Sequence, residues 1–292
     1  MLYTIQNDLL AVTCSETGAE LQAVQDRKLG DAHRLWQSGA DSWKDRAPLL
    51  FPFCGRLKDN RFTENGVEYH CGIHGFAKDL PHTLLKQTGD SLAFTLHSSE
   101  ETRCCYPWDF RIDTLYRLEG NRLIWTVDVY NPGPSKLPFS IGFHPGYAYP
   151  FSAGLSPEGY QLRFEQPESP TRLCHDENGN LTGKEIVLWN KEAVIPLDYP
   201  LLPESFILTG IRSEYVQLEE RATGRYTRVY LGGAPNLTFW EKPGARHFVC
   251  MEPWFGAPDA ANSNGCFWDK RDLIVLEPNE SKRFPHIMEF GL

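Results

Sequence analysis

The sequence predicts an all-β protein. Three observations carry this prediction: polar and apolar residues alternate over many short segments, turn residues separate these segments, and helical periodicity is nearly absent. The 24 glycines and 21 prolines are spread along all 292 residues, which is typical of many short strands joined by turns. We therefore expect a sandwich or barrel. Because large β folds often exceed about 200 residues as one unit, we expect a single domain over residues 1–292.

Four segments have the pattern of β-hairpins. The strongest short signal is Asn65-Gly66, which separates two strand-like runs in RFTENGVEYH. Further turns are expected at residues 88–91, 119–121 and 223–224. The arms around residues 119–121 show the clearest alternation, which consists of Ile112, Thr114, Tyr116 and Leu118, then Leu123, Trp125, Val127 and Val129. Residues 41–46 and 200–206 are each expected to hold a turn or two of helix.

Charge and composition exclude several classes of partner. The formal net charge of −9 argues against nucleic acid and anionic membranes, because both are bound through basic surfaces. No apolar run reaches the roughly 18 residues that a membrane-spanning helix needs. The beginning of the chain lacks the basic and apolar regions of a signal peptide, and the eight cysteines form no CxxC pair. We expect a cytoplasmic protein with reduced thiols.

Four segments break the alternation and concentrate polar residues among glycines, prolines and aromatic residues. They are residues 47–62, 74–82, 138–151 and 248–260. In the third segment, His144 follows an apolar run and precedes a proline. A histidine where an apolar strand gives way to a loop is well placed for catalysis. The alternative is a core histidine that is bonded to a backbone carbonyl.

Glu252 stands in the middle of the apolar run of the fourth segment. A buried carboxylate is costly unless it is paired or protonated, and burial raises its pKa toward the range useful to a general base. The alternative is that Glu252 faces solvent or a structural arginine. Arg56, a planar donor of several hydrogen bonds, follows another apolar run. His74 lies between two glycines in GIHG, where backbone and ligand can approach closely.

In combination these motifs resemble a known family. GRLKDNRF, HGFAKD, FSIGFHPGYAYPF and VCMEPWFGAPD, in this order, are similar to aldose 1-epimerase-like proteins, and specifically to the LacX-like branch. TGAELQAV, TFWEKPGARHFVCMEPW and LEPNES fit the same branch, so the resemblance spans essentially the whole chain. Each motif is loose, but six in register are specific. The resemblance implies a galactose mutarotase-like β-supersandwich with a cleft for a free aldohexose.

The resemblance also assigns roles to individual residues. It implies that Glu252 is the general base for the anomeric hydroxyl and that His144 is the general acid for the ring oxygen. His74 matches a second active-site histidine, and Arg56 matches the arginine that positions the sugar. Glu204 is the nearest counterpart of an aspartate that holds a remote hydroxyl.

The implied activity is that of an isomerase, an aldose 1-epimerase, which interconverts α and β anomers by ring opening and closure. One carboxylate and one imidazole suffice for these proton transfers, so we expect no metal and no cofactor. Trp254 is expected to bind the apolar face of the sugar, with a place in the core as its alternative. The only partner expected is a small sugar, and the chain is a monomer or a homodimer.

Three other interpretations remain open at this point. A hexose-6-phosphate 1-epimerase would need a cationic cluster, for which Arg56, Lys58 and Arg61 are available. A carbohydrate sensor or binding protein would keep the cleft without useful turnover. A metal site could use His74 and His144 together with Glu252.

Overall fold

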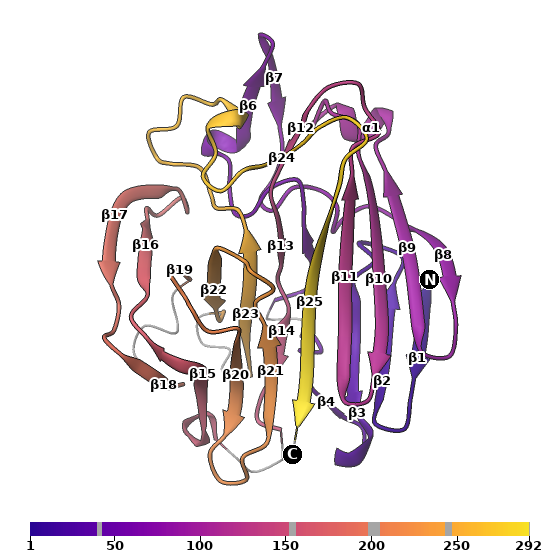
Figure 1. Ribbon diagram of the computed structural model, residues 1–292, viewed down its shortest axis with the longest axis vertical. Helices are drawn as coiled ribbons and strands as arrows, with labels where there is room; N and C mark the ends of the chain where they lie inside the picture. Colours follow the sequence, from indigo (N-terminus) through magenta and orange to yellow (C-terminus); the bar gives the residue numbers. More distant parts are fainter. Residues whose placement is uncertain (40–42, 152–155, 198–204, 243–246, 292) are drawn as a thin grey trace.

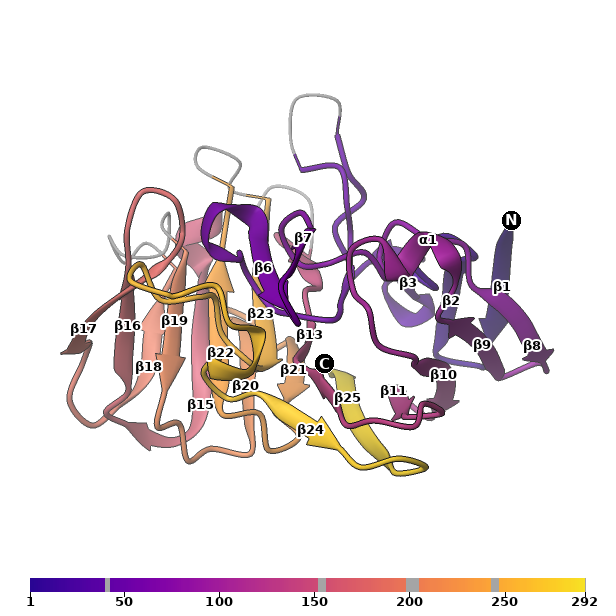
Figure 2. The ribbon, with the colours of Figure 1, turned by 90° about the horizontal axis from the view of Figure 1, so that it is seen from above.

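The computed structural model describes residues 1–39, 43–151, 156–197, 205–242 and 247–291. Strands make up nearly all of its regular structure, so the all-β prediction is confirmed. Two large antiparallel sheets lie opposite each other, and three smaller sheets flank them in the described part of the chain (Figures 1 and 2).

The larger sheet has nine strands. They are β8 (Thr83–Gln87), β9 (Ser91–His97), β10 (Arg111–Glu119), β11 (Arg122–Tyr130), β15 (Tyr160–Glu168), β18 (Glu192–Pro196), β20 (Tyr215–Glu220), β21 (Tyr226–Tyr230) and β25 (Ser281–Gly291). Their order across the sheet is β18-β15-β20-β21-β25-β11-β10-β9-β8. The long strand β25 therefore joins two groups of strands that are distant in the sequence.

The second large sheet has eight strands. They are β5 (Leu49–Leu50), β13 (Ile141–Phe143), β14 (Gly146–Ala148), β16 (Thr171–His175), β17 (Leu181–Val187), β19 (Phe206–Thr209), β22 (Asn236–Trp240) and β23 (Phe248–Phe255). The order is β17-β16-β19-β22-β23-β13-β5, and β14 also pairs with β23. Strand β23 thus has β22 on one side and two separate short strands on the other.

Three smaller sheets and five short helices complete the described part of the fold. The remaining strands are β1 (Leu2–Gln6), β2 (Leu10–Ser15), β3 (Leu21–Asp26), β4 (Ala32–His33), β6 (Arg61–Glu64), β7 (Val67–His70), β12 (Leu137–Phe139) and β24 (Ile274–Leu276). The helices are α1 (Glu100–Arg103) and the 3-10 turns η1 (Arg27–Leu29), η2 (Lys58–Asn60), η3 (Pro157–Gly159) and η4 (Phe267–Asp269). The β6–β7 hairpin projects from the top of Figure 1.

All four predicted hairpins are present. They are formed by β6 with β7, β8 with β9, β10 with β11, and β20 with β21. In the third hairpin the alternating residues are buried on both arms, and Leu118 lies opposite Leu123. No helix is present in the described parts of the two segments expected to be helical, because residues 43–46 are irregular and Phe206 begins β19; residues 41–42 and 200–204 lie outside the described residues.

The short helix α1, which the periodicity does not predict, has a capping box as its local cause. The Ser99 side chain accepts a hydrogen bond from the Thr102 backbone, and the Thr102 side chain accepts one from the Ser99 backbone. Four residues are too few to show a period of 3.6 in the sequence.

Aromatic side chains fill the space between the two large sheets. Trp125 on β11 stacks on Tyr116 of β10, with 5.3 Å between ring centroids, and meets Phe143 of β13 edge-on at 4.8 Å. Phe255 of β23 packs against Phe284 of β25 at 5.0 Å. Such close edge-to-face contacts stabilise the pairing of the sheets beyond the burial of apolar area. These contacts therefore fix the positions of β13 and β23 relative to the larger sheet.

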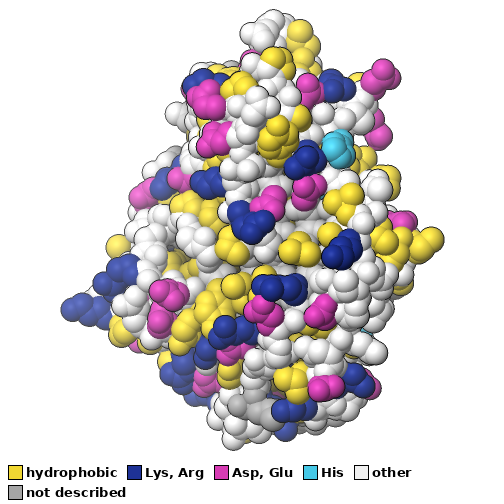
Figure 3. Space-filling view, turned by 45° about the vertical axis from the view of Figure 1, so that its right-hand side comes forward, with side chains coloured by type: hydrophobic (Ala, Val, Ile, Leu, Met, Phe, Trp, Pro, Cys, Tyr) yellow, Lys and Arg dark blue, Asp and Glu magenta, His cyan; other side chains and the backbone are white. Residues whose placement is uncertain are grey.

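Basic and acidic side chains are interspersed on the face shown in Figure 3, so this face offers no continuous basic surface to a phosphate backbone. All eight cysteines lie in the described ranges and are free thiols. Across these ranges, no helix combines the length and the apolar character needed to cross a bilayer.

The inter-sheet packing can be tested with Trp125→Ala. This ring is fully buried between the sheets, so its removal should lower the free energy of unfolding by about 3–5 kcal/mol. The measurement is equilibrium urea unfolding. Leu85→Ala is the control, because Leu85 is 57% exposed and its loss should change stability by less than about 0.5 kcal/mol. Equal effects of the two substitutions would contradict the assigned core.

Candidate active site

A cleft of about 370 Å³ opens on the second sheet. Strands β22 and β23 provide its floor, and loops that precede β5, follow β5 and follow β7 provide the opposite wall. Five of the residues singled out from the sequence line it together, namely Arg56, His74, His144, Glu252 and Trp254. Glu204 lies outside the described residues.

The alternation of β23 determines which of its side chains face the cleft. Successive side chains of a strand point to opposite faces, so Glu252 and Trp254 share one face while Met251 and Phe255 turn toward the core. Glu252 is paired with Thr238 of β22, which also lines the cleft. The strand is buried on both faces, and this explains why its sequence is almost uniformly apolar around one carboxyl group.

His144 lies at an interruption in the strand next to β23. Gly142 of β13 is paired with Trp254, and Gly146 of β14 is paired with Cys250. The same register places His144, midway between these glycines, opposite Glu252. Pro145 follows His144 and has no backbone N–H to continue the ladder, while the His144 N–H donates to the carbonyl of Pro48, outside the pair.

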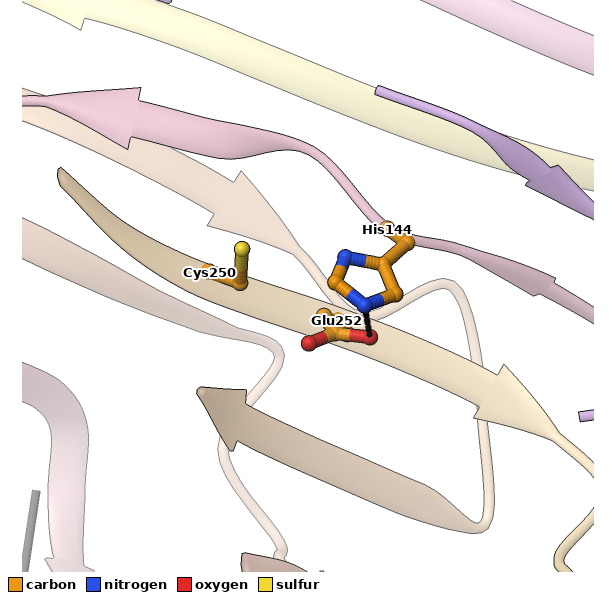
Figure 4. Close-up of side chains that lie close together, drawn as sticks. All are labelled: His144, Cys250 and Glu252. Atoms are coloured by element: carbon orange, nitrogen blue, oxygen red, sulfur yellow. Dashed lines mark ion pairs between the residues drawn. The ribbon is translucent and has the colours of Figure 1, made fainter. Parts of the chain in front are cut away.

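The two side chains meet inside the cleft. His144 Nε2 lies 3.3 Å from Glu252 Oε2, and the Trp254 indole N–H donates to the same oxygen at 3.0 Å. Figure 4 shows the imidazole reaching over β23 toward the carboxyl group. His144 Nδ1 and Glu252 Oε1 are buried and have no hydrogen-bond partner among the described residues. Buried polar atoms usually have hydrogen-bond partners. These two atoms are therefore available to a polar ligand in the cleft.

Burial favours the neutral form of both Glu252 and His144. It raises the pKa of the Glu252 carboxyl well above its ordinary value of 4.5, and the Trp254 hydrogen bond opposes this only in part. Burial also lowers the pKa of His144 to about 3, and the charge of Lys78 adds to this shift. Both shifts therefore favour the neutral forms, a protonated carboxyl group and an uncharged imidazole.

His74 approaches from the loop after β7. Its backbone N–H donates to the carbonyl of Gly55 at 2.8 Å, and the Gly55 N–H donates to His74 Nδ1 at 3.0 Å. Burial lowers the pKa of His74 well below 6.5, and the nearby charges of His144, Lys78 and Arg56 lower it further. A neutral imidazole that accepts at Nδ1 carries its proton on Nε2. His74 is therefore a fixed hydrogen-bond donor.

Several lining residues were not singled out from the sequence. Lys78 belongs to the motif HGFAKD, and Thr238 and Trp240 belong to TFWEKPGARHFVCMEPW, but nothing in these motifs indicated which side chains face a cleft. Trp43 and His175 had no local signal. The Trp43 ring lies 5.0 Å from the His144 ring, and the Trp240 ring lies 5.7 Å from it.

The metal group of His74, His144 and Glu252, considered from the sequence only as an alternative, is not the one that the geometry favours. Within the described ranges, potential ligand atoms of His144, Cys250 and Glu252 lie within 4.8 Å of one another. Cys250 projects from the same face of β23 as Glu252 (Figure 4), but it does not line the cleft. Burial raises the pKa of its thiol well above the ordinary value of 9.0, which opposes the thiolate that a metal requires.

Comparison with known proteins agrees with the motifs. The sequence model described as aldose 1-epimerase matches residues 1–285. The LacX protein of Lactococcus lactis subsp. lactis is 27% identical over 293 residues, which cover 97% of each chain. The YphB protein of Escherichia coli K12 is 23% identical and is covered to 95%, with 96% of this chain aligned.

Solved structures share the whole fold. A galactose mutarotase related enzyme from Lactobacillus acidophilus superposes with a TM-score of 0.94 at 28% identity, covering 100% of this chain and 98% of that one. A galactose mutarotase-like protein from Lactobacillus casei gives a TM-score of 0.92 at 23% identity, with both chains fully covered. The galactose mutarotase-like fold that the motifs implied is confirmed.

The loop that carries His74 can be tested with Gly75→Ala. Gly75 has a φ of +72°, and a β-carbon there would overlap the backbone carbonyl of Phe51. We expect a loss of about 3 kcal/mol or more in urea unfolding, from left-handed strain plus the overlap. Gly66→Ala is the matched control, because its φ is +79° and no atom lies within 4 Å of the added carbon. It should cost only about 1–2 kcal/mol, and equal losses would refute the close approach.

Proposed function

Because the chain belongs to the aldose 1-epimerase family, we propose that it is an isomerase that interconverts the α and β anomers of a free aldohexose. The observation that carries this proposal is the contact of 3.3 Å between His144 Nε2 and Glu252 Oε2 inside the cleft. An acid and a base within reach of the same small ligand are what ring opening requires.

Ring opening transfers one proton at each end of the anomeric centre. The single proton of the pair moves from Glu252 to His144, which creates a carboxylate and an imidazolium together. Glu252 then takes the proton of the O1 hydroxyl, the C1–O5 bond breaks, and O5 receives the proton of His144. The products are the open-chain aldehyde, a protonated carboxyl group and a neutral imidazole, so the pair again holds one proton.

Ring closure on the other face gives the second anomer. Rotation about the C1–C2 bond presents the opposite face of the aldehyde to the O5 hydroxyl. His144 accepts the O5 proton while Glu252 returns its own proton to O1. The reaction consumes nothing and needs no other reactant. The proton count of the pair is the same before and after each turnover.

His74 acts as a hydrogen-bond donor in this scheme. Its Nε2–H stabilises the oxygen on which negative charge develops, because the Gly55 N–H fixes the tautomer. The His74 and His144 rings lie 5.3 Å apart at nearly a right angle, so both can reach one pyranose. Arg56 offers further donors to sugar hydroxyls at the cleft wall. Trp254 contributes its indole edge to Glu252 and its ring to the cleft wall.

The distribution of cations favours a free sugar over a sugar phosphate. Of the three cationic residues considered for a phosphate site, Arg56 is the one found among the described lining residues. The Lys58 ammonium donates to the carbonyl of Ser263 at 3.1 Å, and Arg61 pairs with Glu68 at 2.6 Å. These three side chains therefore form no cationic cluster in the cleft. Lys78 also lines the cleft, and its ammonium is paired with Asp79 at 2.8 Å. A comparison of glucose with glucose 6-phosphate as substrates tests this preference.

Loss of either proton carrier should abolish most of the activity. Each proton transfer contributes about 10²–10⁴-fold, so we expect Glu252→Gln and His144→Ala each to slow anomeric exchange at least about 100-fold. The rate is measured by NMR magnetisation exchange between α and β anomers, after subtraction of the spontaneous rate. Cys250→Ser is the control, because Cys250 lies next to the pair but does not line the cleft and has no part in the transfers.

Two outcomes would reject the proposal. Full activity in both variants would remove Glu252 and His144 from the reaction. Sugar binding by the unaltered protein without accelerated exchange would favour a sensor or binding protein, and binding is followed through the fluorescence of Trp43, Trp240 and Trp254, which line the cleft.

The pH profile should reflect the shifted titrations of the pair. The active state carries one proton, so activity is lost at low pH when His144 takes a second proton, and at high pH when Glu252 loses its proton. Because burial lowers the pKa of His144 to about 3, the acidic limb should lie far below the ordinary imidazole value of 6.5. We expect kcat/KM at about pH 5 to stay within about two-fold of its value at about pH 7. An acidic limb centred near the ordinary imidazole value would contradict this assignment.

A further inference from the structure

A buried ion pair lies behind the cleft wall, outside the site described above. Lys270 Nζ donates to Asp259 Oδ1 at 2.6 Å, and their side chains are only 1% and 5% exposed. Neither residue is among the described lining residues of the cleft. Burying an ion pair carries a large desolvation penalty, so the pair need not stabilise the fold. We therefore considered what else it does at this position.

The pair is bonded directly to the loop that presents Arg56. Asp259 Oδ2 accepts the backbone N–H of Lys58 at 3.0 Å, and the Asp259 N–H donates to the carbonyl of Arg56 at 2.9 Å. Asp259 thus holds the backbone on both sides of Leu57. Its own carbonyl accepts the N–H of Leu181, which ties the same point to the edge strand β17.

The other end of this loop is held by His74. Gly55 exchanges two hydrogen bonds with His74, and a β-carbon at Gly55 would overlap the ring of Pro258, the residue before Asp259. The loop of residues 55–58 is therefore fixed from one side by an active-site histidine and from the other by the buried pair. Arg56 lies between these two anchors.

We propose that Asp259, held in place by Lys270, is a positioning residue that sets the place of Arg56 in the sugar cleft. The charge of Lys270 fixes one carboxylate oxygen, so the other is oriented toward the Lys58 N–H. Without this orientation the loop loses its bond at the Lys58 N–H and keeps the bonds of Gly55 with His74 and of the Arg56 carbonyl with the Asp259 N–H, so the guanidinium is held less firmly. The inference rests on the proposed function for the identity of the ligand, but the backbone contacts that carry it do not.

Asp259→Asn tests the inference. It keeps the shape of the side chain and removes the charge that holds Lys270. Hydrogen exchange followed by mass spectrometry should show faster exchange in peptides that contain residues 55–58. Glu289→Gln is the matched control: Glu289 is also a 5% exposed carboxylate with a cationic partner, Arg122, but it lies on β25. It should leave exchange in this loop unchanged. If Asp259→Asn prevents folding, Lys270→Gln makes the same test while it leaves the Asp259 acceptor in place.

A double-mutant cycle separates positioning from general stability. If Asp259 acts through Arg56, Asp259→Asn should weaken sugar binding about ten-fold in the natural background and less than about two-fold in the Arg56→Ala background. Binding of glucose is measured by tryptophan fluorescence, and exchange between anomers by NMR. Equal effects in both backgrounds, or unchanged loop exchange, would overturn the inference. Failure of the unaltered protein to accelerate anomeric exchange would reject the proposed function and leave the loop measurement to decide the positioning role.

Discussion

The burial of one carboxyl group is the constraint on which the cleft depends. Glu252 is fully buried, and one of its oxygens has no hydrogen-bond partner among the described residues, a situation that costs about 1–3 kcal/mol. The surrounding fold tolerates this cost because β23 is central in its sheet and packs its other face into the core. The same burial raises the pKa of the carboxyl group, which favours its protonated form.

His144, which contacts this carboxyl group, is positioned by an interruption between strands β13 and β14. An uninterrupted strand opposite β23 would direct every backbone group into the ladder, whereas Pro145 ends the pairing at the position where His144 lies opposite Glu252. The flanking strands β13 and β14 resume the same register on either side. Register, which is set by side-chain alternation and core packing, thus fixes the distance between His144 and Glu252.

The sequence predicts this fold well because two-residue alternation and turn residues are local signals, and they locate the hairpins β6–β7 and β10–β11. It also indicates Glu252 and His144, because a polar residue within or next to an apolar run can be recognised from the sequence alone. It does not indicate Trp43 or His175, because their place in the cleft depends on how distant loops fold over the sheet. The pairing of Asp259 with Lys270 is equally invisible, because it depends on the path of the loop between them.

The two walls of the cleft therefore differ in their physical origin. The wall that carries Glu252 and His144 belongs to a sheet, and its geometry follows from strand register and from aromatic packing between layers. The wall that carries His74 and Arg56 consists of loops, whose backbone groups need partners of their own. Those partners are the reciprocal bonds of Gly55 with His74 and the bonds of Asp259 with the Arg56 loop. In the proposed reaction, proton transfer thus depends on the sheet, and orientation of the sugar depends on buried polar contacts behind the loops.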